Sequence, residues 1–241
     1  MSPPAEGATL RRCAAECLGT FALVFIGAGA CIAHHAHPGD LTHVGVALAF
    51  GGVVACMVYC LGHISGAHIN PAVTVALAAV KGFPLRGVAP YVGAQCVGAF
   101  LASAAHLATF GAGASRAAGF GATLPAGTTV AGAFAFEFIL TFMLMWVIMA
   151  VATDARVPPG VAGLAIGAVV CIDCLAAGQA CGASMNPARS LAPAVFAGGP
   201  ALGHLWLYLC APTLGAVAAA LLYQWVRQSS PASPRRAPGR P

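Results

Sequence analysis

The sequence predicts an all-α integral membrane protein, in which six transmembrane helices and two shorter re-entrant half-helices form two inverted repeats. Three observations predict this fold: a very apolar composition, six apolar runs long enough to span a bilayer, and an internal repeat with a short apolar segment in each half. Hydrophobic residues are 59% and charged residues 7% of the chain, whereas soluble domains carry roughly 25% charged residues. Too little polar surface remains to cover a protein in water, so we expect lipid around it.

The six apolar runs each match the roughly 20 residues that a helix needs to cross a bilayer. They are residues 13–33, 44–61, 90–110, 130–152, 161–177 and 202–226. Arg11 and Arg12 before the first run resemble the start of a secretory signal. Because this run is longer than the usual signal core of about 7–15 residues, we expect it to stay as the first span. Two further apolar segments, 69–80 and 185–195, are too short to span at about 1.5 Å of rise per residue, so we expect them to be re-entrant.

The basic residues predict the orientation, because short cytoplasmic loops hold the excess of Lys and Arg. If both termini are cytoplasmic, nearly all of them fall on that side. They are Arg11, Arg12, Lys81, Arg86, Arg156, Arg227, Arg235, Arg236 and Arg240. Arg116 falls in the opposite loops, and Arg189 falls inside the second short segment, where it needs an explanation of its own. The basic residues form no face interleaved with aromatic residues, so we expect no nucleic-acid partner.

The two short segments are copies of each other. SGAHINPAVT, from Ser65, aligns without gaps on CGASMNPARS, from Cys181, and five of the ten residues are identical. Upstream, Glu16 in the first run matches Glu137 in the fourth. Each half therefore contains three spans and one short segment, and because three is odd, the second copy must enter the membrane inverted.

This pattern predicts the domain organisation. Residues 1–10 form an N-terminal cytoplasmic segment, and residues 11–227 form one membrane domain, with repeat one at 11–110 and repeat two at 130–227. Residues 228–241 are rich in Ser, Pro and Arg and cannot bury a core, so we expect a disordered cytoplasmic tail.

Each short segment contains an Asn-Pro-Ala triplet, which is a strong helix start: Asn supplies the cap, and Pro takes the first position, where no backbone donor is lost. The triplets are Asn70, Pro71 and Ala72 in the first half and Asn186, Pro187 and Ala188 in the second. Half-helices inserted from opposite sides would meet near the midplane with their positive N-termini facing each other. The irregular backbone before each Asn carries carbonyls that lipid cannot satisfy but a water-filled lumen can, which predicts a pore. Its positive centre should repel cations and hydronium, while the Asn amides bind the oxygen of a passing water.

These residues resemble the aquaporin, or major intrinsic protein, family from Arg11 to Arg227. The resemblance lies in AAECLGTF from Ala14, GHISGAHINPAVT from Gly62, EFILTF from Glu137 and GASMNPARSLAPA from Gly182. It is greatest to the nodulin-like branch and its bacterial relatives. It implies the six-span hourglass fold, a passive channel through each protomer of a homotetramer, no catalytic residues and no cofactor. The membrane would be the plasma membrane or a bacterial inner membrane.

The resemblance also implies a selectivity filter on the extracellular side, lined by Phe50, Cys174, Ala183 and Arg189. The Arg189 guanidinium would then donate to permeant oxygens and repel cations, which explains its place in the membrane. Water-selective members usually have His at the position of Cys174 and a larger residue at that of Ala183, so this filter should be wider and less polar. Ser190, in contrast, follows the arginine as in water-selective members, where glycerol-selective ones have Asp, so the signals disagree.

We therefore expect a passive channel for water and small neutral solutes that excludes protons and ions. One alternative is a facilitator for glycerol or for metalloid acids such as arsenite and boric acid. Another is an ion-coupled secondary transporter, since these also use inverted repeats and broken helices. A third is a junction protein with a vestigial pore.

The resemblance implies roles for three further polar residues. Glu16 and Glu137 would bind backbone groups of the re-entrant loops, in preference to relaying protons. His68 would line the cytoplasmic half of the pore.

Cys171, Cys174 and Cys181 could form a thiol site for a metal or arsenite. A channel that held its permeant through several thiols would not conduct it, so we expect small packing residues and no metal site. Asp173 has no counterpart in the family pattern, and the sequence predicts no role for it.

Overall fold

The computed structural model describes residues 6–154, 156–158 and 160–228. Within these ranges the chain forms helices joined by loops, and no strand. Residues 1–5 and 229–241 lie outside the described residues, and with them lie half of the predicted N-terminal segment and nearly all of the predicted tail. The elements are α1 (Glu6–Ala36), α2 (His43–Ser65), α3 (Pro71–Ala79), η1 (Leu85–Gly87), α4 (Val88–Thr109), α5 (Gly111–Ala117), η2 (Gly119–Gly121), α6 (Val130–Thr153), α7 (Ala162–Cys181), α8 (Pro187–Ala197), α9 (Gly199–Gly203) and α10 (Leu205–Gln228).

Six helical segments of the described chain are long and apolar enough to cross a membrane, which confirms the predicted fold class. They are Thr9–Ala36, His43–Ser65, Leu85–Thr109, Val130–Thr153, Ala162–Cys181 and Leu205–Arg227. Several extend beyond the predicted apolar runs: α1 begins at Glu6, where the apolar run begins at Cys13. Hydropathy marks only the residues that suit hydrocarbon, whereas backbone hydrogen bonds continue the helix into the polar region near Arg11 and Arg12.

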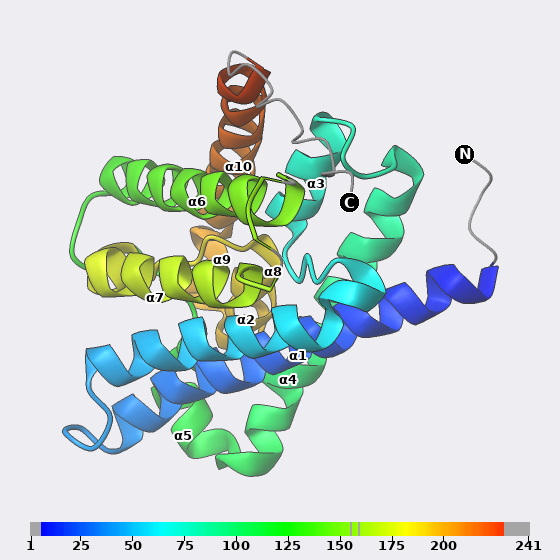
Figure 1. Cartoon of the computed structure of the whole chain (residues 1–241). Helices are drawn as coiled ribbons and strands as arrows, with labels where there is room; N and C mark the ends of the chain where they lie inside the picture. Colours follow the sequence, from blue (N-terminus) through cyan, green and yellow to red (C-terminus); the bar gives the residue numbers. More distant parts are fainter. Residues whose placement is uncertain (1–5, 155, 159, 229–241) are drawn as a thin grey trace, which may run out of the picture.

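The spanning helices of the two repeats pack in matching pairs. α1, α2, α7 and α6 lie side by side in this order, with α4 against α1 and α10 against α6 (Figure 1). Each short helix packs chiefly on the last span of the other repeat, α3 on α10 and α8 on α4, and it also contacts the last span of its own repeat. Each half-helix is thus held by the last span of the other repeat.

Two matched glycines allow the first and last span of each repeat to approach closely. A Cβ on Gly98 of α4 would lie 2.1 Å from the carbonyl oxygen of Cys17 in α1. A Cβ on Gly215 of α10 would lie 2.2 Å from the carbonyl oxygen of Phe138 in α6. Carbon and oxygen cannot approach so closely, so any larger residue would separate these helices, as small-residue contacts in membranes generally require.

The segment between the repeats contains two elements that the apolar pattern did not predict. α5 and the short turn η2 follow α4 and contact α1, and η2 also contacts α8. The segment between Gly111 and Gly121 is mostly Gly and Ala, so it carries no periodic pattern from which helices could be predicted.

Candidate functional site: a cavity at the junction of two half-helices

Both half-helices begin at the predicted Asn-Pro steps. Asn70 precedes α3 with an extended backbone, and its Oδ1 accepts from Ala72 N at 2.9 Å. Asn186 precedes α8 in the same way, and its Oδ1 accepts from Ala188 N at 3.0 Å and from Arg189 N at 3.3 Å. A short polar side chain at this position satisfies amide donors that the first helical turn leaves free.

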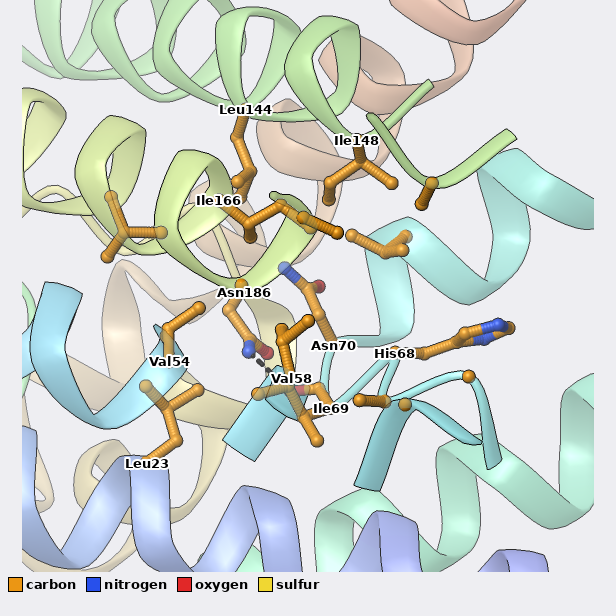
Figure 2. Close-up of a pocket in the computed structure, with 18 of the residues that line it drawn as sticks. Leu23, Val54, Val58, His68, Ile69, Asn70, Leu144, Ile148, Ile166 and Asn186 are labelled. Atoms are coloured by element: carbon orange, nitrogen blue, oxygen red, sulfur yellow. Dashed lines mark hydrogen bonds between the residues drawn. The ribbon is translucent and has the colours of Figure 1, made fainter. Parts of the chain in front are cut away.

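The two caps are also bonded to each other's loops. Asn70 Nδ2 donates to Met185 O at 2.7 Å, and Asn186 Nδ2 donates to Ile69 O at 2.8 Å. Figure 2 shows the two amides lying together at the centre of the cavity. An amide nitrogen has two hydrogens, so each Asn, which also lines the cavity, keeps one donor beyond this contact.

The loop before each cap contains alternating residues in the left-handed region. Ala67 and Ile69 have φ of 46° and 42°, and Ala183 and Met185 have φ of 42° and 51°. Residues with a Cβ rarely adopt this conformation, and each costs on the order of 1–3 kcal/mol unless its surroundings hold it. The backbone groups freed by this conformation must find partners other than those of a regular helix.

Glu16 provides those partners in repeat one. Its side chain is fully buried. Oε1 accepts from His68 N at 3.0 Å and from Ser65 Oγ at 2.6 Å, and Oε2 accepts from Ile69 N at 2.6 Å and from Gln95 Nε2 at 2.7 Å. Both carboxylate oxygens are therefore satisfied inside the protein, as a buried charge requires.

Glu137 has the matching position in repeat two and is also fully buried. Its Oε1 accepts from Ser184 N at 2.7 Å and its Oε2 accepts from Met185 N at 2.8 Å. Each oxygen thus holds one backbone N–H of the second loop. The two acids contact the loop backbone and do not line the cavity.

A cavity of about 650 Å³ runs past the junction of the half-helices. The loops before Asn70 and Asn186 form one polar side of it. Side chains from the spanning helices form apolar walls around the two amides, as Figure 2 shows for Leu23, Val54, Val58, Leu144, Ile148 and Ile166. An apolar wall opposite a line of polar groups is typical of sites for small neutral molecules.

His68 lines this cavity from the first loop. Its Nδ1 lies 3.1 Å from Thr74 Oγ1, and its ring centroid lies 4.8 Å from that of Phe83 in an edge-on contact. Its centroid also lies 5.2 Å from that of Tyr91, so the ring is held on three sides.

The four residues predicted for the filter all line the cavity. Phe50 comes from α2, Cys174 from α7, Ala183 from the second loop and Arg189 from α8. Arg189 is 3% exposed, and its Nη1 donates to Gly121 O at 2.9 Å. Its Cζ lies 4.9 Å from the centroid of the Phe50 ring, within the range of a cation–π contact.

Gly121, in η2, is a site residue that sequence reasoning missed. Gly121 binds Arg189 through its backbone carbonyl oxygen. Because every residue has this group, the sequence carries no signal for the role. Arg189 Nε has no hydrogen-bond partner among the described residues. The guanidinium is thus anchored through Nη1 on the Gly121 carbonyl, and its unpartnered Nε is buried.

Ser190 lies away from the lumen. Its Oγ is 2.7 Å from Thr123 Oγ1 and 2.6 Å from Ser184 Oγ, and the residue is fully buried. Ser190 therefore links the loop after η2, at Thr123, to the loop before Asn186, at Ser184. It does not line the cavity, so it cannot contact a permeant.

The three cysteines considered for a thiol site do not share one surface of the cavity. Cys174 lines the cavity, whereas Cys171 and Cys181 do not. Asp173, beside Cys174, is 6% exposed, and its Oδ2 has no partner among the described residues. The contacts of the described residues assign no role to Asp173.

A charged cluster lies at the C-terminal end of α6, around Asp154. Asp154 accepts from Arg156 Nη2 at 2.6 Å and from Tyr223 Oη at 3.2 Å, and Arg227 Nε lies 3.7 Å away. The hydrogen bonds from Arg156 hold the pKa of the Asp154 carboxyl well below its usual range. Its neighbour Thr153 lines the cavity.

Comparisons with known proteins agree with this geometry. Residues 5–223 match the family described as Major intrinsic protein. The chain is 46% identical over 218 residues to Aquaporin NIP1-1 of Oryza sativa subsp. japonica, covering 90% of this chain and 75% of that protein. It is 44% identical over 218 residues to Nodulin-26 of Glycine max, covering 90% and 78%. The aquaglyceroporin from Plasmodium falciparum has the same fold with a TM-score of 0.81 and 27% identity, covering 91% of this chain and 97% of that one. The chain therefore belongs to the major intrinsic protein family.

Proposed function

We propose that this protein is a passive channel that conducts water and small neutral solutes, with Phe50, Cys174, Ala183 and Arg189 as its selectivity filter. As a member of a channel family, it is not an enzyme. The proposal rests on the cavity that runs past Asn70 and Asn186. The remaining amide donors of these two residues and the side chain of Arg189 line it. Neutral molecules with an oxygen acceptor suit these donors, whereas the fixed charge of Arg189 opposes cations.

The shape of the proposed filter favours solutes larger than water as well as water itself. Cys174 and Ala183 present small side chains to the cavity. Facilitation of glycerol or of a neutral metalloid acid is therefore the second candidate function, and the similarity to an aquaglyceroporin supports it. An ion-coupled transporter fits less well, because no Asp or Glu is among the described residues that line the cavity.

The proposal includes the setting of the channel. The distribution of Lys and Arg supports cytoplasmic termini in a cell membrane. The family supports a homotetramer, in which the apolar outer faces of the helices would contact neighbouring protomers and lipid. Native mass spectrometry from detergent should find four copies per particle, and a monomer under all conditions would contradict this assembly.

The filter can be tested by stopped-flow light scattering on proteoliposomes with water and with glycerol. Cys174→His adds a bulky polar ring to the cavity wall, so glycerol permeability should fall more than water permeability. Cys60→His is the matched control, because Cys60 is exposed on α2 and does not line the cavity. If Cys174→His passes glycerol as the wild type does, Cys174 is not in the filter.

A further inference from the structure

The ring of Phe50 rests against the backbone of α1 at Gly27. A Cβ on Gly27 would lie 2.1 Å from Cε1, 2.4 Å from Cδ1 and 2.6 Å from Cζ of this ring. Non-bonded carbon atoms prefer separations of about 3.5–4.0 Å. The ring therefore occupies the space that any side chain at position 27 would need.

Gly27 lies on the face of α1 that turns toward the cavity. Leu23, four residues earlier, lines the cavity, and residues four apart share one face of a helix. Phe50 lines the cavity and Gly27 does not. The Phe50 ring thus covers Gly27, while the same ring contacts the Arg189 guanidinium with a Cζ to centroid distance of 4.9 Å.

We propose that Gly27 is a specificity-determining residue: its missing side chain fixes the position of the Phe50 ring and thereby the width of the opening beside Arg189. The inference rests on the proposed function, since it takes Phe50 and Arg189 as part of the filter. A Cβ at position 27 would lie 2.1 Å from Phe50 Cε1, so the ring must move by roughly 1.5 Å or more to restore an ordinary carbon–carbon contact. Because the ring already lines the cavity, we expect its movement away from α1 to narrow the opening.

A displacement of this size matters because a water molecule is only about 2.8 Å across. Losing roughly 1.5 Å of width should exclude a carbon-bearing solute before it excludes water. The loss should depend on the ring, because Gly27 itself does not reach the cavity. Unfolding of α1 is not expected in Gly27→Ala, because Ala is a better helix former than Gly.

The test compares Gly27→Ala with Gly52→Ala in proteoliposomes at equal protein content. Gly52 is a matched control, since it lies in α2 and a Cβ there would meet nothing within 4 Å. In Gly27→Ala, glycerol permeability should fall by about tenfold or more, the order of discrimination that one methylene gives. Water permeability should fall by less than about threefold, and Gly52→Ala should match the wild type on both solutes.

The double variant Phe50→Ala/Gly27→Ala separates the ring from the helix. Without the ring, Gly27→Ala should leave the glycerol permeability of Phe50→Ala unchanged, which is the signature of coupling between the two sites. If Gly27→Ala fails to insert, the double variant should insert, because the clash is gone. An equal loss of glycerol permeability in both backgrounds would overturn the inference, as would a Gly27→Ala protein that behaves like Gly52→Ala.

The single variant Phe50→Ala distinguishes the inference from the proposed function. If the wild type conducts and Phe50→Ala raises glycerol permeability while Gly27→Ala changes nothing, only the role of Gly27 is wrong. If Phe50→Ala leaves the glycerol permeability unchanged, or if the wild type conducts neither solute, the filter fails and the role of Gly27 fails with it.

Discussion

Replacing Glu137 by Gln should destabilise the protein by the cost of one buried backbone N–H without an acceptor. Each carboxylate oxygen of Glu137 accepts one main-chain donor, from Ser184 N at 2.7 Å and from Met185 N at 2.8 Å. Gln keeps one oxygen but turns the other position into an NH2 group. Whichever way this amide is turned, a donor faces one of the two backbone N–H groups.

The size of the effect follows from counting these donors. A buried donor left unsatisfied costs about 1–3 kcal/mol, so Glu137→Gln should cost about 1–3 kcal/mol. Glu137→Ala leaves both donors free and should cost about 2–6 kcal/mol. The left-handed residues Ala183 and Met185 on this loop add to the sensitivity, because the same bonds hold their strained backbone.

The free energy of unfolding can be measured by SDS titration in mixed micelles, followed by circular dichroism. Asp40→Asn is the control for charge removal, since Asp40 is exposed in the loop after α1. Surface substitutions usually stay within about 0.5 kcal/mol. A Glu137→Gln protein as stable as Asp40→Asn would refute the reasoning, and so would Gln and Ala variants of equal stability.

Three further predictions concern helix contact, pH and thiol chemistry. Gly215→Ala should lower the yield of folded protein and its thermal stability in detergent, because its Cβ would lie 2.2 Å from Phe138 O; unchanged melting would contradict this contact. Asp154 has a lowered pKa in the folded protein, so its stabilising effect is complete above its unfolded pKa of about 3.9 and is lost as the pH falls toward the folded value. Asp154→Asn should therefore melt below the wild type at neutral pH, and the difference should shrink between about pH 5 and pH 2. Because the Cys174 thiol lines the cavity, a mercurial should reduce water permeability, and Cys174→Ala should resist it; equal block of both proteins would remove Cys174 from the pathway.

The fold was predictable because its signals are local. A run of about 20 apolar residues suits little else than a membrane span, and an Asn-Pro step predicts a helix start from steric and hydrogen-bonding rules alone. The structure begins α3 at Pro71 and α8 at Pro187 as these rules require. The repeat, with an odd number of spans in each half, then predicts that the second half is inverted relative to the first, and this needs no knowledge of contacts.

The features that sequence reasoning missed depend on the backbone. Gly121 holds Arg189 through a carbonyl oxygen, and its position depends on η2, in a segment without apolar periodicity. The left-handed conformation of Ala67 and Ile69 is likewise invisible, because nothing about Ala or Ile favours it. It is held by partners distant in the sequence as well as near: Glu16, 53 residues before Ile69, accepts from Ile69 N, and Ser65 Oγ accepts from Ala67 N.

The crossed bonds between the triplets have a consequence for how the channel is made. Asn70 donates to Met185 O, a partner 115 residues later in the chain. At a synthesis rate of about 5–20 residues per second, the first triplet waits roughly 6–23 s before the ribosome has made that partner. During this interval the loop before Asn70 must stay folded on Glu16 or remain hydrated, and a chain truncated after repeat one would never leave this state. Biosynthesis of this protein is therefore expected to complete the first half only when the second half has entered the membrane.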